Sequence, residues 1–210
     1  VESGRCKKVI VIGADKMSSL VDYQDRQTCV LFGDGAAAVL VEASEDGELG
    51  MQDMFFRTDG KGLPFLHMKA GGSVCPASHF TVDHHLHYLY QEGRSVFRYA
   101  VTDMSNDVVE IMKRNNLSAA DVDWVVPHEA NLRIIEAVAK RAELPMDKVA
   151  INIQHYGNTS AATIPLALWD YESKLKKGDN IIFTAFGAGF VHGASFFKWA
   201  YDGADAVTRK

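Results

Sequence analysis

Residues 122–131 (VDWVVPHEAN), 149–160 (VAINIQHYGNTS) and 180–190 (NIIFTAFGAGF) share one pattern. In each, an apolar run ends abruptly in polar or glycine residues, which predicts buried strands over 122–126, 149–153 and 180–185. Helical spacing between them predicts helices over 132–142 and 159–174, with Pro165 tolerable only near the start of the second. A last strand is expected at 194–199. Strands that alternate with helices predict an α/β layered fold with a largely parallel sheet.

The upstream part of the chain contains further elements. The β-branched run over 9–12, closed by a glycine, predicts a strand buried on both faces. Strands are also expected at 36–41 and 51–56, and a helix at 95–115. Residues 58–92 break the pattern and predict a long loop with one short helix. Loops of this length are uncommon and often functional.

Composition excludes several classes of protein. The 210-residue chain has a net charge of -5, which opposes non-specific binding to nucleic acid. No apolar run approaches the roughly 18 residues of a membrane span, and no signal peptide is evident. Three cysteines without paired or metal-ligand spacing favour a reducing cytoplasm. The chain begins VESGRCKK, without Met, which is typical of the tail of a helix entering a strand and predicts a larger parent protein.

The polar residues gather where the predicted strands end. In open α/β sheets, function lies beyond the C-terminal ends of the strands, and these ends carry His128, Asn158 and the Gly187-Ala188-Gly189 turn. A neutral His and an Asn amide donate hydrogen bonds without adding charge, so together they can stabilise an enolate or a tetrahedral oxyanion. The glycine turn can present a backbone N–H to a second oxyanion. The pattern predicts carbonyl chemistry, without a nucleophile at these positions.

Four segments carry a family resemblance: VVPHEANLRIIEAVAK, HYGNTSAATIPLAL, NIIFTAFGAGF and RQTCVLFGDGAAAVLVE. They resemble β-ketoacyl-acyl carrier protein synthase III, a thiolase-fold condensing enzyme, over almost all of residues 9–199. The resemblance implies α/β/α/β/α layers, with residues 1–45 ending one half and 46–210 forming the other. It implies decarboxylative Claisen condensation of an acyl-CoA primer, of the acetyl-CoA class, with malonyl-acyl carrier protein. Fatty acid synthesis by a cytoplasmic homodimer without metal or redox cofactor is then expected.

The resemblance also implies roles for individual residues. His128 and Asn158 match the pair that stabilises the enolate, and the Ala188 N–H matches half of the acyl oxyanion hole. Residues expected to contact CoA or its pantetheine arm are Arg26, Arg94, Phe97, Ala130, Asn131 and Phe186. Residues expected at the carrier-protein surface are Glu129, Ala130, Asn131, Leu132 and Arg133, where Arg133 would attract an acidic partner.

The chain departs from the family pattern in three places. The nucleophilic Cys is expected upstream of this chain, since Cys6, Cys29 and Cys75 follow no strand-to-helix elbow. Cys6 and Cys29 are interpreted instead as small buried apolar residues. Glu129 stands where the family usually has Gln, and Arg94 where some members have Asn, which weakens the expected docking and CoA contacts.

Simpler interpretations stay open for several of these residues. His128 alone fits a structural histidine, Asn158 a helix N-cap, and Gly33-Asp34-Gly35 a turn into a strand. The stretch His79–His87, with four His, fits a metal site or, more simply, a solvated or interface loop. Functional alternatives are a secondary-metabolite condensing enzyme, a non-catalytic half or subunit and, more remotely, a metal-dependent hydrolase.

Overall fold

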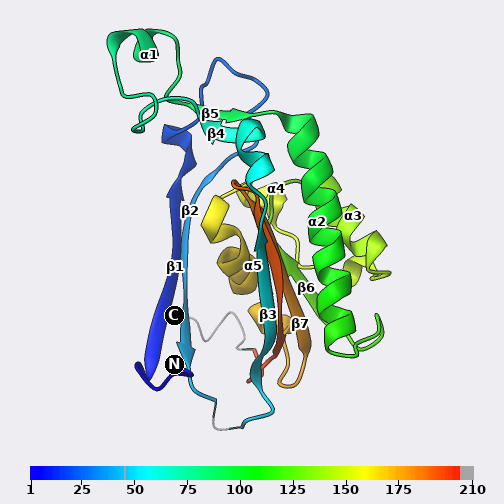
Figure 1. Cartoon of the computed structure of the whole chain (residues 1–210). Helices are drawn as coiled ribbons and strands as arrows, with labels where there is room; N and C mark the ends of the chain where they lie inside the picture. Colours follow the sequence, from blue (N-terminus) through cyan, green and yellow to red (C-terminus); the bar gives the residue numbers. More distant parts are fainter. Residues whose placement is uncertain (45, 204–210) are drawn as a thin grey trace.

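The computed structural model describes residues 1–44 and 46–203, and a four-stranded sheet lies at its centre (Figure 1). Its strand order is β3 (Gly50–Thr58), β8 (Val191–Lys198), β7 (Asn180–Gly187) and β6 (Trp124–Pro127). Only β6 and β7 are parallel, and the other two pairs are antiparallel. The prediction of a largely parallel sheet is therefore wrong. A short turn leads from β7 directly into β8, and such a connection permits only antiparallel pairing.

The strand predicted at 149–153 is also absent from this sheet. Val149 makes one isolated parallel bridge to Val125, and the short helix α4 (Ile153–Tyr156) begins soon afterwards. Side chains take up the backbone groups that a ladder would use. The Tyr171 hydroxyl donates to the Ile151 carbonyl at 3.2 Å, and the Ile153 N–H donates to the Glu129 carboxylate at 3.2 Å.

Helices cover both faces of the central sheet (Figure 1). On one face lie α2 (Gly93–Arg114) and α3 (Leu132–Arg141), close to the predicted ranges, and on the other lies α5 (Thr163–Tyr171). Successive strand residues point to opposite faces, so Ile181 packs on the α5 side and Ile182 on the α2 and α3 side. Both are fully buried.

The helix predicted over 159–174 forms in three pieces. Turns of 3-10 helix at Ser160–Ala162 and Glu172–Lys174 flank α5. Pro165 is the third residue of α5, where its missing N–H removes no helical hydrogen bond.

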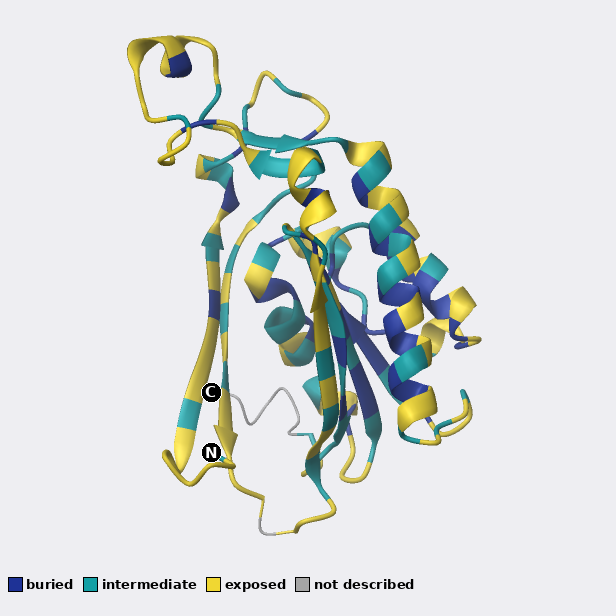
Figure 2. Cartoon of the chain, in the orientation of Figure 1, coloured by how far each residue is buried: buried dark blue, intermediate teal, exposed yellow. Residues whose placement is uncertain are grey.

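A separate two-stranded ribbon lies beyond α5. It pairs β1 (Lys8–Lys16) with β2 (Asp34–Glu42) in antiparallel register. The prediction that 9–12 is buried on both faces is wrong, because Ile10 and Ile12 are 64% and 68% exposed. Figure 2 shows how little of the ribbon is buried compared with the central sheet. Among the described residues, the helical segment after Asn158 and α5 pack against it.

Residues 58–92 contain short elements rather than an open loop. A 3-10 helix at Gly60–Phe65 leads into β4 (Leu66–Met68), which pairs with β5 (Leu89–Gln91). The expected short helix is α1 (His79–Asp83), on an excursion that projects from the end of the molecule (Figure 1).

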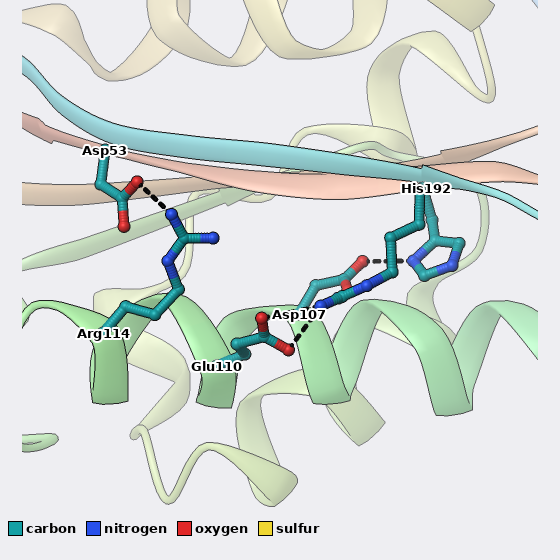
Figure 3. Close-up of polar contacts among 6 residues, drawn as sticks. Asp53, Asp107, Glu110, Arg114 and His192 are labelled. Carbon is teal, nitrogen blue, oxygen red and sulfur yellow. Dashed lines mark hydrogen bonds and ion pairs between the residues drawn. The ribbon is translucent and has the colours of Figure 1, made fainter.

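Ion pairs fasten α2 to the sheet (Figure 3). The Arg114 guanidinium lies 2.7 Å from the Asp53 carboxylate, and Arg57 lies 2.7 Å from Glu110. Asp107, whose side chain is 1% exposed, accepts a 2.6 Å hydrogen bond from the His192 ring. These contacts join α2 to both β3 and β8, so the wall of the molecule that α2 forms is fixed at several points.

Candidate active site

A cavity of about 360 Å³ opens between the central sheet, α2 and the segment that precedes β2. Much of its wall is apolar, including Leu31, Phe32, Leu66, Leu89, Val96 and Ile134. Polar groups are few: they include the side chains of His128, Asn131, Asn158 and Ser160. An apolar cavity with a few converging polar groups is the usual form of a site for a small molecule or a flexible acyl arm.

His128 follows β6 directly. Its backbone N–H donates to the Thr184 carbonyl at 2.8 Å, which extends the pairing of β6 with β7. The ring Nδ1 lies 2.7 Å from the Thr163 hydroxyl oxygen. Burial lowers the pKa of His128 from 6.5 to about 4, because a charged imidazolium is poorly solvated there. The ring is therefore neutral at pH 7.

Asn158 is held by backbone contacts rather than by a strand. Its N–H donates to the Leu31 carbonyl at 3.0 Å, and its carbonyl accepts from the Gly33 N–H at 2.9 Å. Gly157, with a φ of 67°, makes the turn that brings Asn158 there. The side-chain Oδ1 accepts from the Ser160 N–H at 2.9 Å. This bond assigns the oxygen and leaves the amide NH₂ to donate elsewhere.

Ala188 lies in the turn between β7 and β8. Asp59 pins this turn, because the Phe190 N–H donates to the Asp59 carbonyl at 2.6 Å and the Asp59 N–H donates back to the Phe190 carbonyl at 2.8 Å. The fully buried Phe190 ring occupies the space above Gly62, where an added Cβ would meet it at 2.3 Å. The turn is thus fixed by packing as well as by hydrogen bonds.

The predicted convergence of the His, the Asn and the glycine turn is confirmed as geometry: His128, Asn158 and Ala188 all line this cavity. Four other predicted site residues line it as well: Phe97, Ala130, Asn131 and Phe186. The route differs from the one expected. His128 and Ala188 follow the ends of two paired parallel strands, whereas Asn158 arrives through its bridge to Phe32.

The two arginines expected at CoA are not part of the cavity wall. Arg26 and Arg94 are exposed, while the adjacent residues Gln27 and Gly93 line the cavity. A CoA contact by either arginine stays a prediction.

The surface expected to dock a carrier protein is only partly exposed. Leu132 and Arg133 are exposed in the first turn of α3. Asn131 caps that helix, since its side chain accepts from the Arg133 N–H at 2.9 Å. Carrier-protein docking by Leu132 and Arg133 stays a prediction.

The structure contradicts the docking role predicted for Glu129, because this side chain is fully buried. One carboxylate oxygen accepts from the Ile153 N–H, and the other has no hydrogen-bond partner among the described residues. Burial raises the pKa of Glu129 to about 7. This side chain supports the segment that begins α4 and cannot meet a partner protein at the surface.

The cysteines lie away from the cavity. Of the described residues that line it, none is Cys6, Cys29 or Cys75. The expectation that Cys6 and Cys29 are buried is wrong: Cys6 is exposed in the turn before β1, and Cys29 is half-buried in the turn that follows Asp25.

Three histidines of the His-rich stretch contact different partners through their ring nitrogens. His85 binds Asp22 at 2.8 Å, His87 contacts the Thr81 hydroxyl at 2.9 Å, and His84 donates to the Phe80 carbonyl at 2.8 Å. In residues 1–44 and 46–203, no three His, Cys, Asp or Glu side chains are grouped to hold a metal ion. Across the same ranges, no helix has both the length and the apolar character of a membrane span.

Sequence reasoning missed Thr163 and Ser160, which hydrogen-bond to the side chains of His128 and Asn158. Both hydroxyl residues fall within the segment predicted as an uninterrupted helix. A signal was available for Thr163, since a hydroxyl residue at the start of a helix often hydrogen-bonds to a nearby polar group. Ser160 acts instead through its backbone N–H, which residue type does not reveal.

Comparison with known proteins points to one family. The model of "3-Oxoacyl-[acyl-carrier-protein (ACP)] synthase III C terminal" matches residues 112–199, and that of "3-Oxoacyl-[acyl-carrier-protein (ACP)] synthase III" matches residues 1–60. A β-ketoacyl-[acyl-carrier-protein] synthase III from Phocaeicola vulgatus is 66% identical over 97% of this chain. The chain spans 61% of the length of that relative.

Solved structures agree in fold. The 3-oxoacyl-(acyl carrier protein) synthase III from Pseudomonas aeruginosa PAO1 superposes with a TM-score of 0.85 at 35% identity, over 97% of this chain and 61% of that one. The priming β-ketosynthase of the R1128 polyketide pathway gives 0.83 at 32% identity, over 96% and 60%. The expected thiolase-like fold is confirmed. The chain belongs to the β-ketoacyl-[acyl-carrier-protein] synthase III family.

Proposed function

We propose that the protein catalyses decarboxylative Claisen condensation of an acyl-CoA primer, of the acetyl-CoA class, with malonyl-acyl carrier protein. This reaction would initiate fatty acid synthesis. The single observation that carries the proposal is the convergence of His128, Asn158 and Ala188 on one largely apolar cavity. Membership of the family supports the choice of substrates.

The proposed chemistry uses hydrogen-bond donors rather than a cofactor. Loss of CO₂ leaves the bonding electron pair on the malonyl unit as a thioester enolate. The enolate oxygen would accept hydrogen bonds from the His128 ring and the Asn158 amide, two neutral donors that stabilise charge as it develops. The enolate carbon then attacks the acyl thioester carbonyl, whose oxyanion would accept from the Ala188 N–H. Collapse of that intermediate releases the thiolate that carried the acyl group.

The acyl group requires a nucleophile, and the proposal takes it from a Cys outside residues 1–210, because the three cysteines of this chain do not line the cavity. On this proposal residues 1–45 complete one half of the enzyme and residues 46–210 form the other. Residue 45 and residues 204–210 lie outside the described residues. The β1–β2 ribbon and β3 belong to separate sheets, which supports this division.

Both substrates would be held by residues around this cavity. Arg26, Arg94 and Phe97 would contact CoA or its pantetheine arm, and exposed Leu132 and Arg133 would meet the acidic carrier protein. The resemblance to the family further supports a cytoplasmic homodimer that needs no metal or redox cofactor.

Decarboxylation of malonyl-acyl carrier protein and condensation with acetyl-CoA test this function in the purified protein. His128→Ala and Asn158→Ala should each reduce decarboxylation by about 100-fold, as expected for the loss of a donor to a developing oxyanion. His79→Ala and Asn106→Ala, at exposed positions away from the cavity, are matched controls that should retain full activity. Unchanged decarboxylation in both cavity variants would refute the proposal.

Two alternatives have specific support. The likeness to the R1128 priming β-ketosynthase favours a secondary-metabolite condensing enzyme, which would prefer a primer other than acetyl-CoA. The position of the cysteines favours a non-catalytic half or subunit. A 210-residue intact mass, with neither decarboxylation nor condensation, would support that second alternative.

A further inference from the structure

Thr163 is the partner of the cavity histidine. Its hydroxyl oxygen lies 2.7 Å from Nδ1 of His128 and 3.0 Å from the Ser160 carbonyl oxygen. Thr163 is 3% exposed and is the first residue of α5. Because Nδ1 is occupied in this way, Nε2 is the ring nitrogen left to interact with a molecule in the cavity.

The positions of two protons, one on His128 and one on Thr163, decide how this contact works. A neutral imidazole carries one ring proton, and a hydroxyl group carries one. If Thr163 donates to Nδ1, the His128 proton resides on Nε2 and can be donated into the cavity. If Thr163 donates to the Ser160 carbonyl instead, Nδ1 carries the proton and Nε2 presents a lone pair. The two tautomers would give His128 opposite roles, as a hydrogen-bond donor or as a base.

The surrounding hydrogen bonds favour the first arrangement. The Ser160 carbonyl already accepts from the backbone N–H of Thr163, so it remains satisfied without the hydroxyl. Among the described residues, Nδ1 of His128 has the Thr163 hydroxyl as its side-chain partner. A buried ring nitrogen without a partner costs free energy, whereas the carbonyl loses only a second hydrogen bond.

We infer that Thr163 is a positioning residue, whose hydroxyl donates to Nδ1 of His128 and so keeps the proton on Nε2, directed at the substrate oxygen. The inference rests on the proposed function and adds to it the group that selects the donor tautomer. The neutral state that it requires agrees with the low pKa of the His128 ring, about 4.

Nitrogen-15 NMR of the histidine rings reports the tautomer directly. His128→Gln assigns the signals of His128 in the 210-residue chain. The wild-type ring should be protonated on Nε2, and Thr163→Ser, which keeps the hydroxyl, should preserve that state. Thr163→Val should give a mixture of tautomers and lower decarboxylation by at least about 10-fold, with Thr163→Ser close to wild type.

A matched control is available in the same motif. Thr159 is fully buried, and its hydroxyl has no hydrogen-bond partner among the described residues. Thr159→Val therefore removes a buried hydroxyl that makes no hydrogen bond to His128, and it should leave the His128 tautomer unchanged.

A wild-type ring protonated on Nδ1 would overturn the inference, as would Thr163→Val with an unchanged tautomer and rate. A different result would refute the proposed function itself, namely full decarboxylation by His128→Ala and Asn158→Ala. Should Thr163→Val not fold, the wild-type and Thr163→Ser spectra still decide the matter.

Discussion

On one side of the cavity His128 follows a strand of the central sheet, where α2 and α3 bury the neighbouring residues almost completely. On the other side Asn158 leans against residues 31–33, which lead into a ribbon whose apolar side chains are largely exposed. Both residues line the same cavity, yet dense packing fixes the first and a few backbone hydrogen bonds fix the second. Substitutions of buried residues on the His128 side should therefore lower the free energy of unfolding. Substitutions near Asn158 should lower it only where they displace the backbone.

The largest expected effect comes from removing core volume on the His128 side. Ile182→Ala should lower the free energy of unfolding by about 3 kcal/mol, since it leaves a cavity among fully buried side chains. Ile10→Ala, the same substitution at a ribbon residue that is 64% exposed, should cost less than about 1 kcal/mol. Urea denaturation of the 210-residue chain measures both, and equal losses would remove the distinction between the two sides.

Next comes the backbone contact that supports Asn158. An added Cβ at Gly33 would lie 2.0 Å from the Tyr156 carbonyl oxygen. Gly33→Ala should therefore displace the segment before Asn158 and lower the free energy of unfolding by about 2 kcal/mol, as overpacking does. Gly47→Ala, where nothing lies within 4 Å, is the control. If the Gly33→Ala chain is as stable as the control, the prediction is wrong, because the backbone at this contact then accommodates the added methyl group without loss of stability.

A smaller, pH-dependent effect is expected at Glu129. Its native pKa of about 7 exceeds the ordinary value of 4.5, so the native state binds the proton more tightly than the unfolded state does. Its contribution is favourable at low pH and is lost as the pH rises toward 7 and above. Glu129→Gln, which cannot ionise, should be more stable than wild type by about 1–2 kcal/mol at pH 8, with little difference at pH 5. Thermal unfolding at the two pH values measures this, and a difference independent of pH would contradict it.

The smallest effects come from surface ion pairs. Lys8 and Glu42 on the ribbon are 66% and 53% exposed, so Lys8→Ala should change the free energy of unfolding by less than about 0.5 kcal/mol. Arg114→Ala should cost about 1 kcal/mol, because Arg114 binds half-buried Asp53 and also stacks over Phe55. Denaturation in 0.1 M and 1 M salt compares the two, and a larger loss for Lys8→Ala would reverse the comparison.

Local sequence accounts for much of the central sheet and its helices. The predicted ranges 95–115 and 132–142 match α2 and α3 closely, because apolar residues at helical spacing need one buried face. The error at 149–153 has a different origin. Its apolar alternation suits a strand, but its backbone groups form hydrogen bonds with the side chains of Tyr171 and Glu129 instead of with a neighbouring strand. These two partners lie 20 and 24 residues away in the sequence.

The candidate site divides in the same way. The identities of His128, Asn158 and Ala188, and the kind of chemistry they suit, could be read from motifs, because each motif is a local strand end or turn. Their convergence could be predicted as well, but the bridge that brings Asn158 there, the burial of Glu129 and the contact of Thr163 with His128 could not. Those features depend on which segments the folded chain brings together, and such contacts between distant residues leave no periodic trace in the sequence.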